Sequence, residues 1–325
     1  AVARVIIDDG QGSLEDQVSA AFQLVPTLPN FEPASAPQPD IDIPELVRPE
    51  NLIFDNGLGG FAPDDREYII YLASGETTPA PWVNILANDG FGCAVTEAGG
   101  GFTWAVNSGD NRLTAWTNDA VMDDPGEVLY LRDEETAEVW TPTPGPNGRE
   151  ASCQIRHGAG YSEWRKISFG LEQDLRVFVP VNDPVKIIRL RLTNHTARHR
   201  RITATYYVDW LLGALRSVSR STICCSYDPD HHAITARNSW SPDFSGQVAF
   251  LTANHQPHGL TTDRREFLGS EGNLETPAGL GRWGLEGLAS AGTDPCGADQ
   301  VHCELEPGAS QEIVFLLGQG ADNQQ

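Results

Sequence analysis

Tryptophan and hydrogen-bonding side chains are concentrated between residues 77 and 140. This stretch holds four of the chain's eight tryptophans, interleaved with asparagine, arginine and aspartate. A flat indole face suits the C–H face of a sugar ring, while amide, guanidinium and carboxylate groups suit the hydroxyls at its rim. The candidate carbohydrate-binding residues are therefore Trp82, Trp104, Asn107, Asn111, Arg112, Trp116, Asp119, Arg132 and, further along, Arg264.

The same tryptophans have a second interpretation. Most large aromatic side chains serve packing before they serve ligands, so these residues are also typical of the core of a β domain with turn residues between them. Composition alone favours packing. Arg264 and Arg265, beside Glu266, also have two interpretations. Either they hold a loop by an ion pair, or they reach a sugar.

Acidic pairs at residues 8–9, 64–65 and 123–124 suggest glycosidase chemistry. That chemistry needs two carboxylates facing each other across a substrate, about 5–10 Å apart. Neighbours in sequence on a turn do not provide this geometry. We therefore predict no catalytic residue in this chain.

Asp228, Asp230, His231 and His232 resemble a set of metal ligands. They fall in a predicted hairpin turn, where aspartate and proline are expected for backbone reasons. A metal site also needs convergent ligands with supporting contacts.

The sequence has neither a GxxxxGK(S/T) phosphate loop nor a GxSxG nucleophile motif. We predict no metal and no cofactor.

Charge excludes two classes of partner. Lys+Arg is 22 and Asp+Glu is 45, which gives a formal net charge of −23. Such a surface repels nucleic acid and anionic membranes. The one basic cluster, residues 198–201, is interpreted as a solvated turn between two strands. No apolar run reaches the roughly 18 residues of a membrane span.

Six cysteines occur without a CxxC pair, and Cys224 and Cys225 are adjacent in a predicted strand, where their side chains point to opposite faces. Buried free thiols in a reducing compartment are the simpler expectation.

Short apolar runs separated by glycine, proline, asparagine and aspartate predict an all-β domain from residue 51 to about 320. Apolar residues alternate with other residues in 174–181, 185–193 and 201–210. Residues 226–238 are typical of a hairpin, and 312–318 of a last strand. With no internal repeat, this pattern favours a large antiparallel β-sandwich.

The N-terminal 50 residues differ from the rest. Residues 14–25 predict a short amphipathic helix with Ser13 as its N-cap. Residues 26–50 carry seven prolines and predict an extended linker. The start lacks an initiating Met and a signal-peptide pattern, so the chain is expected to be cut from a longer protein.

The order of several segments resembles the N-terminal β-sandwich of glycoside hydrolase family 94, formerly glycosyltransferase family 36. The strongest likeness is to the version found in cyclic β-1,2-glucan synthases and β-1,2-oligoglucan phosphorylases, and it covers residues 51–320. The segments that carry it include NGLGGF (56–61), TTPAPWVN (77–84), FGCAVTEAGGGFTWAVNSGDNRLTAWTND (91–119), GEVLYLRDEETAEVWTPT (126–143), NDPVKIIRLRLTN (182–194), YYVDWLLG (206–213), TDRREFLG (262–269) and VFLLGQG (314–320).

This resemblance implies a galactose-mutarotase-like supersandwich followed by a helical linker, which would begin at 321–325, and an (α/α)6 barrel. In the family the barrel carries the catalytic acid and the phosphate-binding residues, and phosphorylases cleave a β-glucosidic bond with inversion. It also implies loops near an oligomer interface, so a homodimer is one expected partner. The family places this domain in the cytoplasm, in a parent that is either soluble or anchored in the inner membrane.

Two functional hypotheses follow. In the first, the chain is the non-catalytic sandwich of a β-glucan phosphorylase or cyclic glucan synthase, inactive alone, which supports and partly lines a glucan site with the barrel. In the second, it is a self-sufficient glucan-binding module that uses Trp82, Trp104 and Trp116. A free-standing mutarotase-like enzyme ranks last, because no spacing identifies a facing His and Glu pair.

Overall fold

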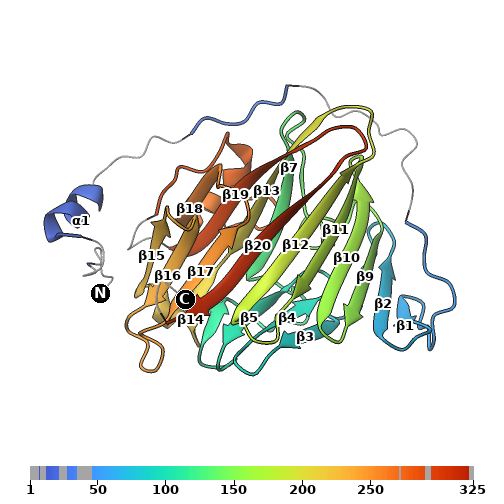
Figure 1. The fold of residues 1–325 in the computed structure, drawn as a ribbon, viewed down its shortest axis with the longest axis horizontal. Helices are drawn as coiled ribbons and strands as arrows, with labels where there is room; N and C mark the ends of the chain where they lie inside the picture. The colour runs from blue at the N-terminus through green and yellow to red at the C-terminus, as the bar shows by residue number, and fades with distance from the viewer. Residues whose placement is uncertain are drawn as a thin grey trace.

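The computed structural model describes residues 7, 12–21, 28–34, 46–270, 272–289 and 294–321. Its elements are almost all strands, and every strand pair within its three sheets is antiparallel (Figure 1). The expected all-β antiparallel architecture is confirmed.

The large sheet has ten strands and forms one layer of the sandwich. Its central strands alternate strictly, so Ile188, Leu190 and Leu192 are buried on one face while Arg189 and Arg191 lie on the other. In spatial order its strands are β1 (Gly59–Phe61), β2 (Glu67–Leu72), β9 (Cys153–Gly158), β10 (Tyr161–Ser168), β11 (Leu171–Phe178), β12 (Val185–Asn194), β20 (Ser310–Gly320), β17 (Val248–Ala253), β16 (Ala233–Asn238) and β15 (Ile223–Asp228).

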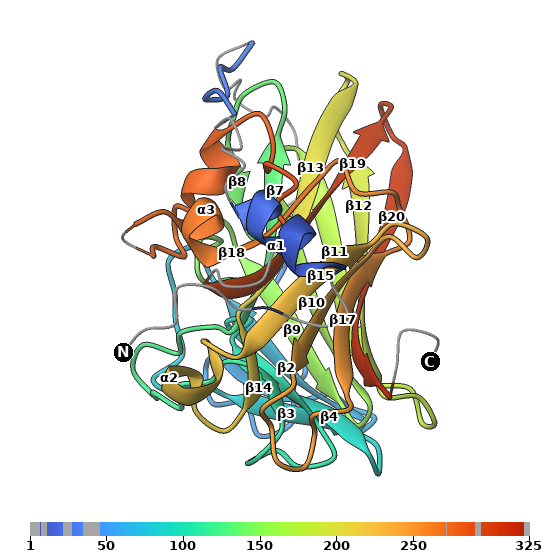
Figure 2. The same cartoon turned by 90° about the vertical axis from the view of Figure 1, so that its left-hand side faces the viewer.

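Two five-stranded sheets form the other layer. The β13 sheet contains β18 (Gly259–Asp263), β19 (Pro295–Leu305), β13 (Arg200–Val208), β7 (Glu127–Asp133) and β8 (Val139–Trp140). The β5 sheet contains β14 (Trp210–Gly213), β6 (Arg112–Thr114), β5 (Gly101–Ala105), β4 (Phe91–Thr96) and β3 (Val83–Ala87). One continuous apolar core joins all three sheets, and Figure 2 shows the two layers from the side.

The two small sheets differ on their outer faces. That of the β13 sheet is covered by α3 (Arg264–Leu268) and the 3-10 turn η1 (Ala278–Gly281), and Tyr207 stacks on Phe267 with ring centroids 4.8 Å apart. On the outer face of the β5 sheet, Val83 and Ile85 are 55% and 57% exposed. One further short helix, α2 (Arg216–Ser219), follows β14.

A polar cluster interrupts the apolar core at the start of β7. The Glu127 carboxylate accepts hydrogen bonds from the Thr103, Thr114 and Tyr206 hydroxyls and pairs with Lys186 Nζ at 2.5 Å. Burial opposes ionisation of Glu127, but Lys186 and the hydroxyls outweigh it and lower the pKa. The pair joins the β13 sheet to the large sheet.

The N-terminal helix α1 (Leu14–Ala21) begins at Ser13, whose hydroxyl accepts from the Asp16 amide, so the predicted N-cap is confirmed. Residues 22–27 and 35–45 lie outside the described part. Residues 28–34, within the predicted linker, lie against the domain: Asn30 forms a β-bridge with Arg282, and Phe31 packs edge-on against Trp283. This part of the sequence is not a free linker, because an aromatic side chain anchors it.

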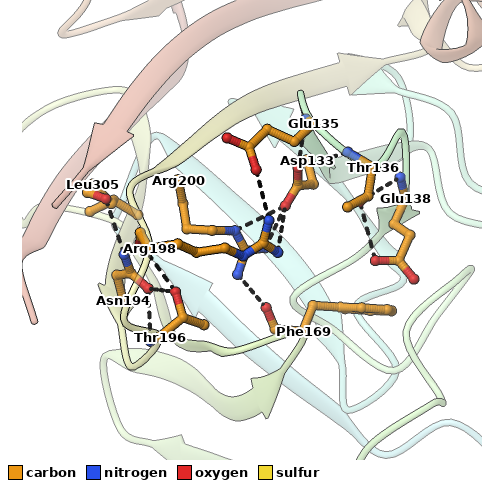
Figure 3. Close-up of polar contacts among 10 residues, drawn as sticks. All are labelled: Asp133, Glu135, Thr136, Glu138, Phe169, Asn194, Thr196, Arg198, Arg200 and Leu305. Atoms are coloured by element: carbon orange, nitrogen blue, oxygen red, sulfur yellow. Dashed lines mark hydrogen bonds and ion pairs between the residues drawn. The ribbon is translucent and has the colours of Figure 1, made fainter. Parts of the chain in front are cut away.

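The predicted solvated turn at residues 198–201 is only partly confirmed: residues 198–199 connect β12 to β13, but residues 200–201 belong to β13 and Arg200 is buried. Arg200 starts β13 with its side chain 1% exposed, and its guanidinium binds the Asp133 carboxylate and the Phe169 carbonyl. Arg198 binds Glu135 at 2.7 Å. Figure 3 shows these groups converging where β7 ends and β13 begins. The cationic side chains are placed by acidic partners on a neighbouring turn that sequence proximity does not reveal.

Candidate functional site

The four tryptophans of residues 77–140 have different surroundings. Trp140 is 1% exposed in the core, where its Nε1 donates to Gln173. Trp82 is half-buried and packs edge-on against Tyr68 at 5.9 Å. Trp104 and Trp116 are half-buried and belong to an aromatic cluster. Packing explains Trp140 fully and the other three in part.

The aromatic cluster lies on the outer face of the β5 sheet. Phe102 stacks on Trp116 with ring centroids 4.5 Å apart, and Trp104 lies 5.2 Å from Phe102. The Arg112 guanidinium lies over both Phe102 and Trp116. Trp104 pairs across the strands with Gly92, where a Cβ would lie 2.5 Å from the indole. The glycine is therefore what allows Trp104 to lie flat on β4.

The other predicted residues are distributed between turns and interior. Asn107 and Asp119 accept backbone amides within their own turns, and the Met122 and Val121 amides lower the pKa of Asp119. Asn111, 2% exposed, bonds Gln319. Arg132, 1% exposed, bonds the Leu280 carbonyl. Asn111 and Arg132 are thus structural ties and do not join Trp104 at the surface.

A polar groove lies beside the β5 sheet, where β6 connects to β7. It consists of two hollows of about 460 and 290 Å³, which share Ala98, Met122, Asp123 and Arg149. Residues 115–126 separate the hollows, and residues 76–81, 144–149 and 272–275 form the sides. Among the predicted residues, Arg264 lines this groove.

Asp123 lies at the junction of the two hollows. Its Oδ2 accepts from the Thr96 hydroxyl at 2.7 Å. Burial, opposed by this hydrogen bond and reinforced by Glu97 and Asp124, raises the pKa of Asp123 to about 6. Gly100 forms the floor, since a Cβ there would lie 2.6 Å from Asp123 Oδ2. The carboxylate is thus held in place at the centre of the groove.

Arginines complete the groove. Arg264 lies 3.8 Å from Asp209 and 3.9 Å from Asp294, and Arg216 bridges the same two carboxylates at 2.8 and 2.9 Å. Arg149 is exposed between the hollows, and no described residue forms a hydrogen bond or ion pair with its guanidinium. The groove therefore presents both a carboxylate and a guanidinium to any ligand.

Comparison with known proteins identifies the family. Residues 66–325 match the model of the glycosyl hydrolase 94 supersandwich domain. The chain belongs to this family. The expected fold and family resemblance are thereby confirmed.

Relatives of this supersandwich include a cyclic beta-(1,2)-glucan synthase of Rhizobium meliloti (strain 1021), 36% identical over 275 residues, which span 84% of this chain and 10% of the synthase. A solabiose phosphorylase of Paenibacillus borealis is 28% identical over 82% of this chain and 35% of its own length. Among solved structures, a putative aldose 1-epimerase from Escherichia coli K12 aligns with a TM-score of 0.45 and 8% identity, covering 74% of this chain and 99% of that one. The chain thus spans a tenth of the synthase and about a third of the phosphorylase.

Sequence reasoning missed the main groove residues of the supersandwich. In the sequence Asp123 is only half of an acidic pair, and no motif singles out Arg149. Their common signal is a position in proline- and glycine-rich connections, DDPG at 123–126 and PGPNGR at 144–149. Connections of this kind resemble simple turns in the sequence, although loops carry ligand contacts more often than strands do.

The candidate metal ligands and the cysteines of the supersandwich do not line the groove. The described residues contain no group of three or more His, Cys, Asp and Glu side chains arranged to hold one metal ion. His231 instead pairs with Asp228 at 2.8 Å within its turn. All six cysteines lie in the described part of the chain, where they are buried and form no disulfide. Within the described part, no helix is long and apolar enough to cross a bilayer.

Proposed function

We propose that this supersandwich is the non-catalytic part of an enzyme acting on β-glucan, by phosphorolysis or by cyclic β-1,2-glucan synthesis. In this proposal it supports and partly lines a glucan site completed by an (α/α)6 catalytic barrel of the same parent chain. The observation that carries it is the family match over residues 66–325, together with the 36% identity to a cyclic beta-(1,2)-glucan synthase. A cytoplasmic location and a homodimer stay predictions that rest on the family resemblance.

The side-chain chemistry supports a non-catalytic role. Glycoside cleavage with inversion needs a carboxylic acid placed against a nucleophile-binding region, with a separation of about 6.5–9.5 Å when two carboxyl groups share the work. In the groove, Asp209 is engaged by Arg216, and Asp124 follows Asp123 directly in sequence. Neither of these two carboxylates is therefore placed across a substrate from Asp123, and Glu97, which also lines the groove, accepts from the Thr78 hydroxyl and the Trp82 amide.

An activity assay tests this proposal. The 325-residue chain is incubated with β-1,2-gluco-oligosaccharides and inorganic phosphate, and glucose 1-phosphate is measured, with an active family phosphorylase on its own substrate as positive control. We expect no glucose 1-phosphate from the chain. Repeated turnover by the chain, lost on heating, would contradict a non-catalytic role.

A second candidate function is a self-sufficient glucan-binding module, and the aromatic cluster of Phe102, Trp104 and Trp116 favours it. If Trp104 is a stacked anchor, Trp104→Ala weakens glucan binding by about 1–3 kcal/mol. Unchanged glucan affinity after this substitution would show that the aromatic cluster serves packing and not glucan binding.

A further inference from the structure

The groove around Asp123 has the size of a ligand site. Its larger hollow, about 460 Å³, falls within the range of about 300–1,000 Å³ typical of small-molecule sites. The second hollow, about 290 Å³, shares Asp123 and Arg149 with the first. A ligand in either hollow therefore lies against both residues.

The polar lining suits a neutral ligand rich in hydroxyls. Both carboxylates and guanidinium groups line the larger hollow, which is bordered by Asp123, Asp124, Arg149 and Arg264. A lining of both signs is uniformly complementary neither to an anion nor to a cation. A sugar hydroxyl both donates and accepts, so it can donate to the Asp123 carboxylate and accept from Arg149.

The apolar lining fits the same ligand. The second hollow is bordered by Pro79, Pro81 and Pro144, and Met122 borders both hollows. These flat or flexible apolar groups can pack on the C–H faces of pyranose rings while leaving the hydroxyl rims to polar side chains. The backbone also limits rearrangement, because the Gly145 amide donates to the Ala98 carbonyl at 2.7 Å and joins two sides of the groove.

We propose that this groove binds a linear β-linked gluco-oligosaccharide, with Asp123 and Arg149 as its central hydrogen-bonding pair. The inference rests on the proposed function, since it assigns the glucan to one place on the supersandwich. It also separates this surface from the aromatic cluster, because Trp104 and Trp116 do not line the groove.

Calorimetric titration of the full chain with β-1,2-gluco-oligosaccharides, and with cello-oligosaccharides of equal length, tests the assignment. The groove variants are Asp123→Asn and Arg149→Gln. Their matched controls are Asp89→Asn and Arg66→Gln, which alter exposed side chains outside the groove. Thermal unfolding of every variant confirms that it is folded. Trp104→Ala is titrated in parallel.

We expect wild type, both controls and Trp104→Ala to bind alike, and each groove variant to bind about tenfold or more weakly, as for loss of a hydrogen bond to a charged group. Groove variants that bind like wild type would overturn the inference, as would absence of binding heat with both sugar series. Neither outcome removes the supporting role, which is contradicted separately by glucose 1-phosphate turnover.

Discussion

Arg200 and Asp133 form a fully buried ion pair, with Arg200 Nη2 2.6 Å from Asp133 Oδ2 and both side chains 1% exposed. They lie at the end of β7 and β13 opposite the groove, since β7 begins after Gly126 and ends at Asp133. The same carboxylate accepts the Glu135 and Thr136 amides through its Oδ1. Both ends of these strands therefore carry charged residues, and at the end opposite the groove the central pair of Arg200 and Asp133 is fully buried.

Removal of one partner of this pair should be strongly destabilising. Asp133→Ala leaves the Arg200 guanidinium buried without its counter-charge, and we expect a loss of about 3–5 kcal/mol in the free energy of unfolding. The control is Arg201→Ala on the same strand, where a 54% exposed side chain pairs with Glu304 and about 0–1 kcal/mol is expected. Denaturant unfolding measures both. Similar losses in the two variants would show that Arg200 is not a structural tie.

The buried pair of Glu127 and Lys186 should behave as a unit. Lys186→Met alone leaves the carboxylate without its cation, and a loss of about 3–5 kcal/mol is expected. Adding Glu127→Gln removes the remaining charge and keeps an acceptor for the Thr103 and Thr114 hydroxyls, so the double variant should be more stable than Lys186→Met. Additive losses in a double-mutant cycle would count against the pairing.

Asp299 should make stability fall as pH rises. Its side chain is 1% exposed, neither carboxyl oxygen has a hydrogen-bond partner among the described residues, and burial raises its pKa to about 7. Between the ordinary value of 3.8 and about 7, the folded state holds a proton that the unfolded state has released. The free energy of unfolding then falls with pH by up to about 1.4 kcal/mol per unit in that window.

Asp299→Asn isolates this effect from other titrating groups. Unfolding is measured for wild type and variant at several pH values, and the difference between them is expected to favour the variant increasingly from about pH 4 to pH 7. A difference that does not change with pH would mean that the Asp299 carboxyl titrates normally.

The outer face of the β5 sheet should promote self-association. Val83 and Ile85 are 55% and 57% exposed beside the aromatic cluster, and contiguous apolar surface of this kind marks interaction sites. Ile85→Lys is expected to shift the chain towards monomer at high concentration in light scattering. A wild-type protein that is already monodisperse and monomeric there would contradict this expectation.

Phe31 should hold residues 28–34 against the domain. Its ring lies 4.6 Å from the Arg132 guanidinium and 5.0 Å from Trp283, and its amide donates to the Gly281 carbonyl. Phe31→Ala should speed amide exchange at residues 28–34 and 280–284 by at least several-fold, with little effect on global stability. Unchanged amide exchange would show that backbone hydrogen bonds alone hold residues 28–34 against the domain.

Sequence pattern predicted the strands well because burial on one face imposes period-two alternation. The runs at 174–181, 185–193, 201–210 and 312–318 correspond to β11, β12, β13 and β20, with ends shifted by a few residues. Which strands become neighbours was not predictable, since β12 pairs with β20 across more than a hundred residues. Alternation identifies a buried face but carries no information about the partner strand.

The site was predicted less well, because side-chain type does not reveal surroundings. Arg132 and Asn111 have the chemistry of sugar ligands but are 1% and 2% exposed. Asp123 and Arg149 occupy loops whose sequences indicate only turns, and the fold brings them together. The resemblance to glycoside hydrolase family 94 added the fold and the enzyme class, and no residue-level assignment within this domain.

The central claim is that this supersandwich contacts β-glucan. A calorimetric titration of the chain with β-1,2-gluco-oligosaccharides, using cello-oligosaccharides as the comparison, tests it most directly. We predict saturable binding heat with the β-1,2 series, and weaker binding with the cello series. No binding heat with either series, in a chain shown to be folded, would contradict glucan recognition by this domain and leave it a purely structural support.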